Sequence, residues 1–317
     1  MKKFIVVVTG PTATGKSDFA EKLAQKLGGE IINADIGSWY APLNIGTAKP
    51  NLNTMSIAYH LFNILNKPEQ FTVVAFRNRV EQLTEEIWSR GKIPVIVGGS
   101  AFYIKALWYK SQESGSSSEI EHVLMKSTQS TQDLWRQLFE IDQFRAEKIN
   151  NNDRYRVVRA LGIYTATGQK PSSFNPVYDP IAPIFGFFCY RERQELYDRI
   201  NYRTELMLQN GWIEEVQNIM GTEWEKFLIE KKIIGYDDII HYLRSGKTSL
   251  LYDNLVTTIQ QKTRNYAKRQ ITFLSKLKRD IMNDTDKSSY TMYIQEIDLM
   301  AQEINQVVQD LYRIIMA

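Results

Sequence analysis

Short apolar runs alternate with amphipathic stretches over the first hundred residues of the chain. The predicted elements are, in order, a strand at 4–8, a helix at 17–27, a strand at 30–34, a helix at 73–90 and a strand at 93–97. The strands are apolar runs rich in β-branched residues, typical of strands buried on both faces, whereas the helices carry apolar residues every three or four positions. Alternation of strands and helices predicts an α/β fold, a parallel sheet flanked by helices.

The pattern changes after Leu107. In order, residues 111–119 are polar and predict a surface loop, 120–167 are helical and charged, 171–183 are a proline-containing connection, and 184–190 are another sheet strand. After Tyr190 the pattern is helical nearly to the end. We therefore expect a P-loop α/β core at 1–110, a mostly helical inserted domain at 111–180, and the remainder of the core with C-terminal helices at 181–317.

Composition narrows the class of protein. The 317 residues are 43% hydrophobic and 24% charged with a net charge of +3, as in soluble globular proteins. Cys189 is the single cysteine, which excludes a disulfide framework and a cysteine zinc site within one chain. The apolar run at 4–8 is too short for a signal peptide, and no stretch approaches the roughly 20 apolar residues of a membrane span. We expect a cytoplasmic protein.

A phosphate-binding loop lies between the first strand and the first helix. The segment reads Gly10-Pro11-Thr12-Ala13-Thr14-Gly15-Lys16-Ser17, a complete match to G-x-x-x-x-G-K-[ST]. In such a loop, backbone N–H groups and the positive end of the helix bind phosphate oxygens. Lys16 adds a positive charge, and the Ser17 hydroxyl is the usual ligand of Mg²⁺. A nucleotide kinase or an ATPase is the default interpretation of this loop alone.

The carboxylate chemistry differs from that of a typical ATPase. The strand at 93–97 ends in Gly98-Gly99-Ser100, where a Walker-B aspartate is usual. Asp35 instead follows the second strand, beside the phosphate site in this topology. Three roles are open for Asp35: metal ligand, general base and helix cap.

A basic stripe lies near the C-terminal end. It contains Lys262, Arg264, Lys268, Arg269, Lys276, Lys278 and Arg279, with no acidic residue between them. Such a stripe, interleaved with aromatic residues, indicates contact with a nucleic-acid backbone or a polyphosphate. The alternative is a solvated helix face.

Seven segments, taken in order, resemble the tRNA dimethylallyltransferases (isopentenyl-tRNA transferases, the IPP transferase family). They are Gly10–Ser17, Asn44–Pro50, Gly91–Leu107, Asn152–Leu161, Leu196–Asn201, Ile234–Tyr236 and Thr263–Gln270. The resemblance implies transfer of a dimethylallyl group from dimethylallyl diphosphate to N6 of the adenosine 3′-adjacent to the anticodon, with release of pyrophosphate. It also implies Mg²⁺ as cofactor and the tRNA anticodon stem-loop as partner, with no membrane, no obligatory protein partner and a monomeric state.

The resemblance further implies residue roles. The catalytic residues are Asp35, Thr12, Arg199 and Lys16; the diphosphate is bound by Gly10, Pro11, Thr12, Ala13, Thr14, Gly15, Lys16 and Ser17; and Ser17 is the metal ligand. The tRNA-binding residues are Asp35, Ile36, Gly37, Ser38, Ser100, Tyr155, Arg156, Val157, Val158, Arg159, Arg264, Lys268 and Arg269. The target base has to be flipped out of the loop to reach such a site.

One segment departs from the family pattern. The family usually has Asp-Ser-x-Gln after the second strand, and here the residues are Asp35-Ile36-Gly37-Ser38. Three alternatives stay open: prenyl transfer to free adenylate, a P-loop nucleotide kinase, and a non-catalytic RNA-binding relative.

Overall fold

The chain forms two compact units. The computed structural model describes residues 3–54, 56–111, 118–246, 248–300 and 303–317. The first unit comprises Met1–Trp108 and Pro180–Ala317, and the second comprises Tyr109–Asp179. Most of the polar segment predicted at 111–119 lies outside the described residues.

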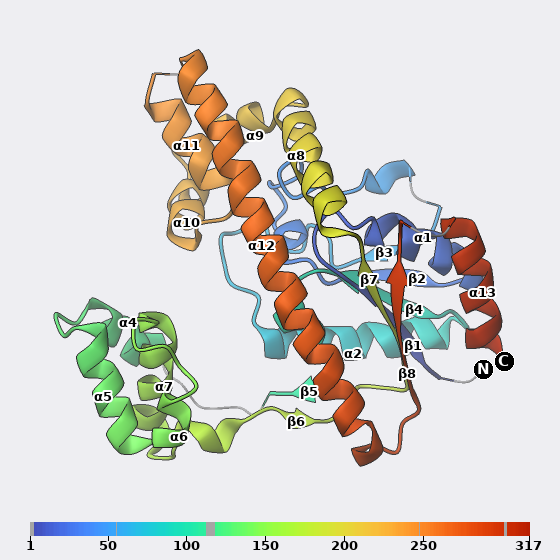
Figure 1. Ribbon diagram of the computed structural model, residues 1–317, viewed down its shortest axis with the longest axis horizontal. Helices are drawn as coiled ribbons and strands as arrows, with labels where there is room; N and C mark the ends of the chain where they lie inside the picture. The colour runs from blue at the N-terminus through green and yellow to red at the C-terminus, as the bar shows by residue number, and fades with distance from the viewer. Residues whose placement is uncertain (1–2, 55, 112–117, 247, 301–302) are drawn as a thin grey trace. The chain divides into compact units, whose positions relative to one another are not determined.

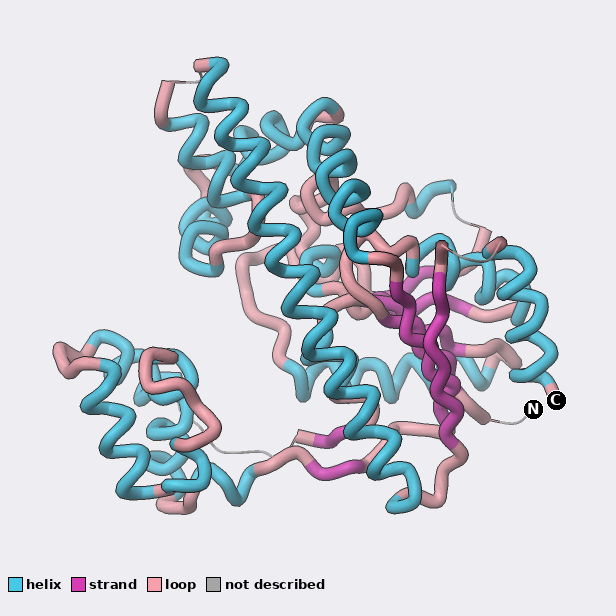
Figure 2. Tube along the Cα trace, viewed as in Figure 1, coloured by secondary structure: helices cyan, strands magenta, loops and turns pink. Residues whose placement is uncertain are grey.

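A six-stranded sheet is the centre of the first unit (Figures 1 and 2). Its strands are β1 (Ile5–Thr9), β2 (Glu30–Asn33), β3 (Tyr59–His60), β4 (Pro94–Gly98), β7 (Ile184–Tyr190) and β8 (Met292–Asp298). They lie in the order β3-β2-β4-β1-β7-β8, and every neighbouring pair is parallel. All residues of β1 and β4 are buried, as their apolar sequences predict. The predicted α/β fold is confirmed.

Helices cover both faces of this sheet. Helices α1 (Lys16–Leu27) and α13 (Ile304–Met316) lie side by side on one face, where Phe19 and Leu311 share a core with Val6 and Val8 of β1. The other face is covered by α2 (Val73–Ser89), α3 (Ala101–Lys105) and α12 (Ser249–Asp284).

A helical region precedes α12 in the first unit. It consists of α8 (Arg193–Gln209), α9 (Trp212–Ile219), α10 (Glu223–Lys231) and α11 (Tyr236–Arg244). The short 3-10 turns of this unit are η1 (Ile36–Trp39), η2 (Leu52–Thr54) and η4 (Thr285–Lys287). Helix α8 lies along α12, and Leu196, Ile200 and Ala267 form a buried cluster that also holds Ala13 of the phosphate loop (Figure 1). This contact fixes α8 beside the loop.

The prediction that the chain is helical from Tyr190 nearly to its end is wrong at β8. Residues Met292–Asp298 form a strand that pairs in parallel with β7. Most of β8 is only half-buried, with Ile297 its one buried residue. An edge strand of this kind has a weak apolar pattern, and its conformation follows from the open edge of β7, a partner about a hundred residues away along the chain.

The second unit is mostly helical, as predicted. Its elements are β5 (Tyr109–Lys110), α4 (Ser118–Lys126), α5 (Thr131–Ile141), α6 (Gln143–Ala146), α7 (Arg154–Thr167), η3 (Pro171–Phe174) and β6 (Val177–Tyr178). Its core includes Leu134, Leu138, Val157, Val158 and Leu161. The antiparallel pair β5–β6 brings the two ends of the unit together.

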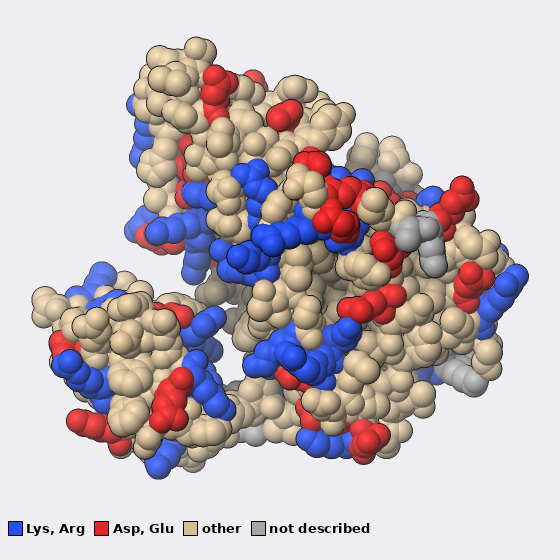
Figure 3. All heavy atoms as spheres, viewed as in Figure 1, with Lys and Arg blue, Asp and Glu red and all other residues tan. Residues whose placement is uncertain are grey.

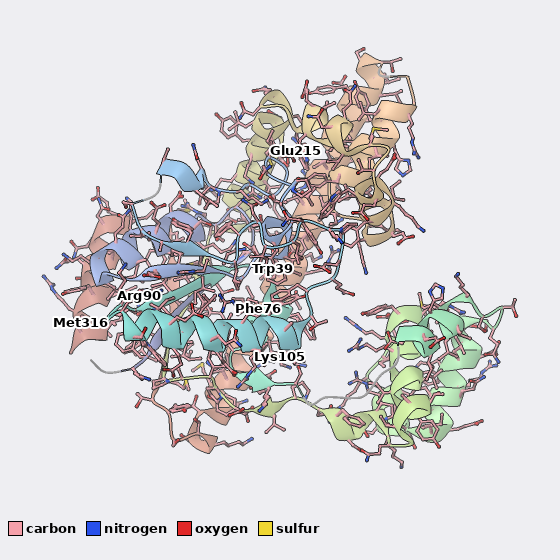
Figure 4. All side chains as sticks on the ribbon, turned by 180° about the vertical axis from the view of Figure 1, so that it is seen from behind. Trp39, Phe76, Arg90, Lys105, Glu215 and Met316 are labelled. Atoms are coloured by element: carbon pink, nitrogen blue, oxygen red, sulfur yellow. The ribbon has the colours of Figure 1, made fainter. Side chains whose placement is uncertain are left out.

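A buried carboxylate at the start of β2 should make the fold sensitive to acid. Glu30 is 2% exposed and lies within 3.0 Å of His60, Arg90 and Lys92, of which Arg90 is labelled in Figure 4. Burial acts to raise the pKa of Glu30, but the hydrogen bonds from these three side chains lower it to about 2. A carboxylate whose pKa is depressed in the folded state stabilises the fold at pH values above its pKa in the unfolded chain. This stabilisation is lost as the pH falls through the pKa of the folded state.

We therefore expect this contribution to disappear between about pH 4.5 and pH 2. Unfolding of the wild type and of Glu30→Gln by urea at several pH values measures it. The wild type should lose more stability than the variant across this window, and equal pH profiles would contradict the assignment.

Candidate active site

The phosphate loop joins β1 to α1. Thr14 closes it, because its side-chain hydroxyl and its backbone amide both donate to the Pro11 carbonyl, at 2.9 and 3.4 Å. Gly15 occupies the N-cap of α1 with φ of 91°, a conformation that favours glycine. No side chain in the described part of the chain caps α1. The first amides of the helix are thus available to an anion.

Lys16 and Asp35 face each other across this loop. The Lys16 side chain is 8% exposed, and its Nζ lies 3.7 Å from Oδ2 of Asp35. The other oxygen of Asp35, Oδ1, accepts from the Gly99 amide at 2.6 Å and from the Ser100 hydroxyl at 3.4 Å. The carboxylate is therefore anchored through one oxygen, and the second oxygen is directed toward Lys16.

The structure excludes one of the three roles considered for Asp35. Asp35 precedes η1, but within the described residues its side chain makes no capping hydrogen bond to that turn. The turn is held instead by Trp39, which is fully buried and stacks on Phe76 of α2 with ring centroids 5.6 Å apart (Figure 4). General base and metal ligand remain.

Three arginines hold three consecutive residues of the loop. Arg203 donates to the Thr12 hydroxyl at 2.5 Å, Arg199 donates through Nε to the Ala13 carbonyl at 2.8 Å, and Arg191 donates through Nε to the Thr14 carbonyl at 2.7 Å. Burial lowers the pKa of Arg203, and nearby Asp35 opposes this effect. The sequence identified Arg199 but missed Arg203, although its spacing of four residues places it on the same helical face.

Helix α12 contributes a polar clamp that sequence reasoning also missed. Gln270 is 4% exposed; its Oε1 accepts from the Thr12 amide at 2.9 Å, and its Nε2 donates to the Gly99 carbonyl at 2.6 Å. Tyr266 makes hydrogen bonds with Ser100 and Gln270, and burial raises its pKa to about 12. The amide of Gln270 thus ties the phosphate loop to the end of β4, the strand beside Asp35.

Residues 36–38, which depart from the family pattern, directly follow Asp35 and are half-buried or buried. Ser38 is 5% exposed and Ser100 is 8% exposed, so neither side chain is open to a base. The Ser100 hydroxyl accepts from the Ile36 amide at 3.1 Å. A methyl group on Gly37 would lie 2.9 Å from Cγ2 of Thr47, so Gly37 lets the next loop approach. Of this segment, the side chain of Ile36 and the backbone of Gly37 are half-buried.

That next loop is held by a single carboxylate. Glu215 of α9 accepts hydrogen bonds from the amides of Asn44, Ile45 and Gly46 at 2.8, 2.7 and 3.3 Å (Figure 4). It also accepts from the Tyr236 hydroxyl at 2.7 Å. The helices before α12 are in this way attached to the loop that supports Asp35.

The residues present fit one Mg²⁺ ion bound together with a diphosphate. Ser17 is exposed at the start of α1, and no hydrogen bond of its hydroxyl occurs within the described residues. The described residues contain no cluster of three or more His, Cys, Asp or Glu side chains able to hold a metal. Magnesium at phosphate loops takes few protein ligands and completes its shell with phosphate oxygens and water.

Three members of the basic stripe bond to side chains of other elements, and the remaining four are exposed. Lys262 bonds to Asp237 and Asp238, and Lys278 bonds to Glu296. Arg264 donates to Asn201 of α8 and to Gln261, and therefore joins two helices. Lys268, Arg269, Lys276 and Arg279 are exposed. Figure 3 shows Lys and Arg side chains gathered in two groups along α12.

In the second unit, the predicted tRNA-binding residues of α7 do not share one environment. Tyr155 is 57% exposed. Arg156 and Arg159 are also exposed, but Nη1 of Arg156 lies 3.3 Å from Oδ2 of Asp153, and Nη1 of Arg159 lies 3.7 Å from Oε1 of Glu121. The assignment of Val157 and Val158 to tRNA binding is wrong, because both side chains are buried in the core of this unit. On an amphipathic helix, five consecutive residues cannot all face a ligand.

Comparisons with known sequences identify a family that matches most of the chain. The sequence model of the IPP transferase family matches residues 38–277. The tRNA dimethylallyltransferase of Caldanaerobacter subterraneus subsp. tengcongensis is 38% identical over 282 residues, which cover 85% of this chain and 88% of the relative. The tRNA dimethylallyltransferase of Alkaliphilus metalliredigens is 37% identical over 301 residues, 91% of this chain and 94% of the relative.

Solved structures give the same result. A tRNA delta(2)-isopentenylpyrophosphate transferase from Staphylococcus epidermidis aligns with a TM-score of 0.64 and 28% identity over 99% of both chains. A eukaryotic dimethylallyltransferase described as acting on tRNA aligns with a TM-score of 0.78 and 26% identity over 98% of this chain and 78% of its own. Among the described residues, no helix has both the length and the apolar character needed to span a bilayer.

Proposed function

The chain belongs to the IPP transferase family, and on that premise we propose that it is a cytoplasmic tRNA dimethylallyltransferase. It transfers a dimethylallyl group from dimethylallyl diphosphate to N6 of the adenosine 3′-adjacent to the anticodon and releases pyrophosphate. One observation carries the proposal for this chain: a phosphate loop lies against a carboxylate whose second oxygen is turned toward the loop lysine.

The reaction needs a base and a stabilised leaving group. The N6 lone pair attacks C1 of the dimethylallyl group, the C1–O bond breaks, and its electron pair leaves with the pyrophosphate. Asp35 accepts the N6 proton. Lys16, Arg199 and the loop amides neutralise the negative charge that grows on the leaving oxygens. When bound, Mg²⁺ held by Ser17 supplies further positive charge to the diphosphate.

Thr12 is held so that its own proton is available. Its oxygen accepts from Arg203, so the hydroxyl hydrogen can be donated to the bridging oxygen of the leaving diphosphate. Gln270 holds the Thr12 backbone, which fixes the position of this hydroxyl relative to the loop. Thr12, Lys16, Asp35 and Arg199 thus act on one reacting centre.

The direct test combines the purified protein with Mg²⁺, dimethylallyl diphosphate and unmodified tRNA. Nucleoside mass spectrometry should find prenylated adenosine next to the anticodon, with one pyrophosphate released per transfer. Transfer to free adenylate alone would favour a small-molecule acceptor, and phosphate transfer from ATP would favour a kinase. Either outcome would overturn the proposal.

The exposed basic residues of α12 should bind the tRNA backbone. Lys268→Ala combined with Arg269→Ala should weaken binding of an anticodon stem-loop and reduce the salt dependence of affinity. The slope of log K against log salt concentration is negative, and its magnitude should decrease by about 0.7 to 0.9 for each lost phosphate contact. Fluorescence anisotropy at several salt concentrations measures the slope.

A control is available on another helix of the same unit. Lys226 of α10 is also highly exposed, with 83% of its side chain open to solvent. Lys226→Ala should leave the slope unchanged. An unaltered slope in the double variant would assign Lys268 and Arg269 to solvated surface.

A further inference from the structure

Arg191 lies beside the phosphate loop, at a position to which neither the sequence motif nor the resemblance assigns a role. It directly follows β7, the sheet neighbour of β1, and precedes the first turn of α8. Its side chain is 10% exposed, which is unusual for an arginine. A guanidinium so enclosed has a structural or a binding purpose, because its desolvation is costly.

Two contacts fix this guanidinium. Nε donates to the Thr14 carbonyl at 2.7 Å, and Nη1 donates to Oε1 of Glu195, one turn along α8. No hydrogen bond of Nη2 occurs within the described residues. The side chain is therefore held at two nitrogens and has its third nitrogen free.

Nη2 of Arg191 and Nη2 of Arg199 both lie near Gly15 of the phosphate loop. A methyl group built on Gly15 would lie 3.7 Å from Nη2 of Arg191 and 3.9 Å from Nη2 of Arg199. Arg199 repeats the arrangement of Arg191, since its Nε is bonded to the preceding loop carbonyl, that of Ala13. Two guanidiniums thus reach Gly15 from one helix end, each anchored through Nε to the loop.

We propose that Arg191 is a second diphosphate-binding arginine, preorganised by Glu195 to contact the allylic diphosphate and the released pyrophosphate together with Arg199. The inference rests on the proposed function for the identity of its ligand. Two fixed guanidiniums match a diphosphate, which presents several oxygens to planar donors. Glu195 acts as a positioning residue, and it balances the charge of Arg191 while the site is empty.

Binding of pyrophosphate to the full chain, measured by calorimetry with Mg²⁺ present, tests this inference. Arg191→Met removes the charge-assisted contact and should weaken pyrophosphate binding by about 10- to 100-fold. Arg191→Lys keeps a charge but cannot reproduce the anchored fork, so its affinity should be intermediate. KM for dimethylallyl diphosphate should rise in parallel, while affinity for tRNA stays unchanged.

Arg193→Met is the matched control. Arg193 lies two residues further along the chain, at the start of α8, but it is exposed and donates to the Tyr197 hydroxyl at 3.0 Å. Its replacement should leave pyrophosphate affinity within about twofold of the wild type. Glu195→Ala should weaken binding, and Glu195→Gln should restore it, because the amide oxygen still accepts from Nη1.

The outcomes separate this inference from the proposed function. If Arg191→Met binds pyrophosphate as the wild type does, the Arg191–Glu195 pair is only a structural ion pair and the inference is overturned. If the variant binds weakly while the wild type modifies no tRNA, the second diphosphate-binding arginine stands and the proposed reaction fails. If the wild type prefers Mg²⁺-ATP to pyrophosphate, the ligand assignment fails.

Discussion

Replacement of Asp35 by asparagine should lower the turnover of tRNA prenylation by about 10²- to 10⁴-fold, the range for loss of a general base. Asparagine keeps the size of the side chain, and its oxygen can still accept from the Gly99 amide as Oδ1 does now. What the variant loses is the basic oxygen directed toward Lys16, the atom that receives the N6 proton. Single-turnover kinetics with tRNA and dimethylallyl diphosphate measure the step.

The control for Asp35 separates chemistry from folding and binding. Asp310 lies on α13 and is 52% exposed, and Asp310→Asn should retain full turnover. Affinity of Asp35→Asn for the anticodon stem-loop should change little, because the substitution preserves the shape of the loop end. Near-normal turnover in Asp35→Asn would overturn the assignment of this carboxylate as the general base.

Loss of the loop lysine should have the next largest effect. Lys16→Met should reduce turnover by about 10²- to 10³-fold, as expected when one donor to a developing anion is removed. The Lys16 side chain is 8% exposed, and its Nζ would lie 3.2 Å from a methyl group built on Gly99, so the ammonium group is held in place rather than free in solvent. A fixed charge stabilises the leaving pyrophosphate without reorganisation, which is why its loss is costly.

The comparison variant for this residue lies on the same helix. Lys22 of α1 is exposed and bonds to Asn305 at 3.0 Å. Lys22→Met removes an equal charge away from the loop and should keep turnover within about twofold of the wild type, as is usual for surface substitutions. Comparable losses in Lys16→Met and Lys22→Met would mean that net charge, and not a contact with the diphosphate, controls the rate.

Much of the first unit was predictable because its signals are local. A buried parallel strand is a continuous apolar run, and a phosphate loop needs glycines and a lysine at set spacings in one short segment. The predicted strands at 4–8, 30–34 and 93–97 each fall within one residue of β1, β2 and β4 at both ends. The edge strand β8 was not predicted, because its conformation follows from its pairing with β7 and not from the pattern of apolar residues in its own sequence.

The basic stripe shows the limit of composition. Its charges are adjacent along the chain, but Lys262, Arg264 and Lys278 are bonded to residues of three other elements, namely α11, α8 and β8. Charge can be counted from the sequence, whereas the availability of a charge depends on which partners the fold brings near it.

By itself, the sequence determined the α/β class, the phosphate loop and a helical insertion, and it predicted Lys16 and Asp35 as candidate chemical groups, because periodicity and short motifs encode these features within a few residues. Only the tertiary structure decided that Arg191, Arg199 and Arg203 meet three consecutive loop residues and that Gln270 clamps the loop to β4. These contacts join residues 171 to 258 positions apart in the chain. Such pairs form only when the sheet, α8 and α12 pack together, since packing, and not local propensity, brings distant side chains within hydrogen-bond distance.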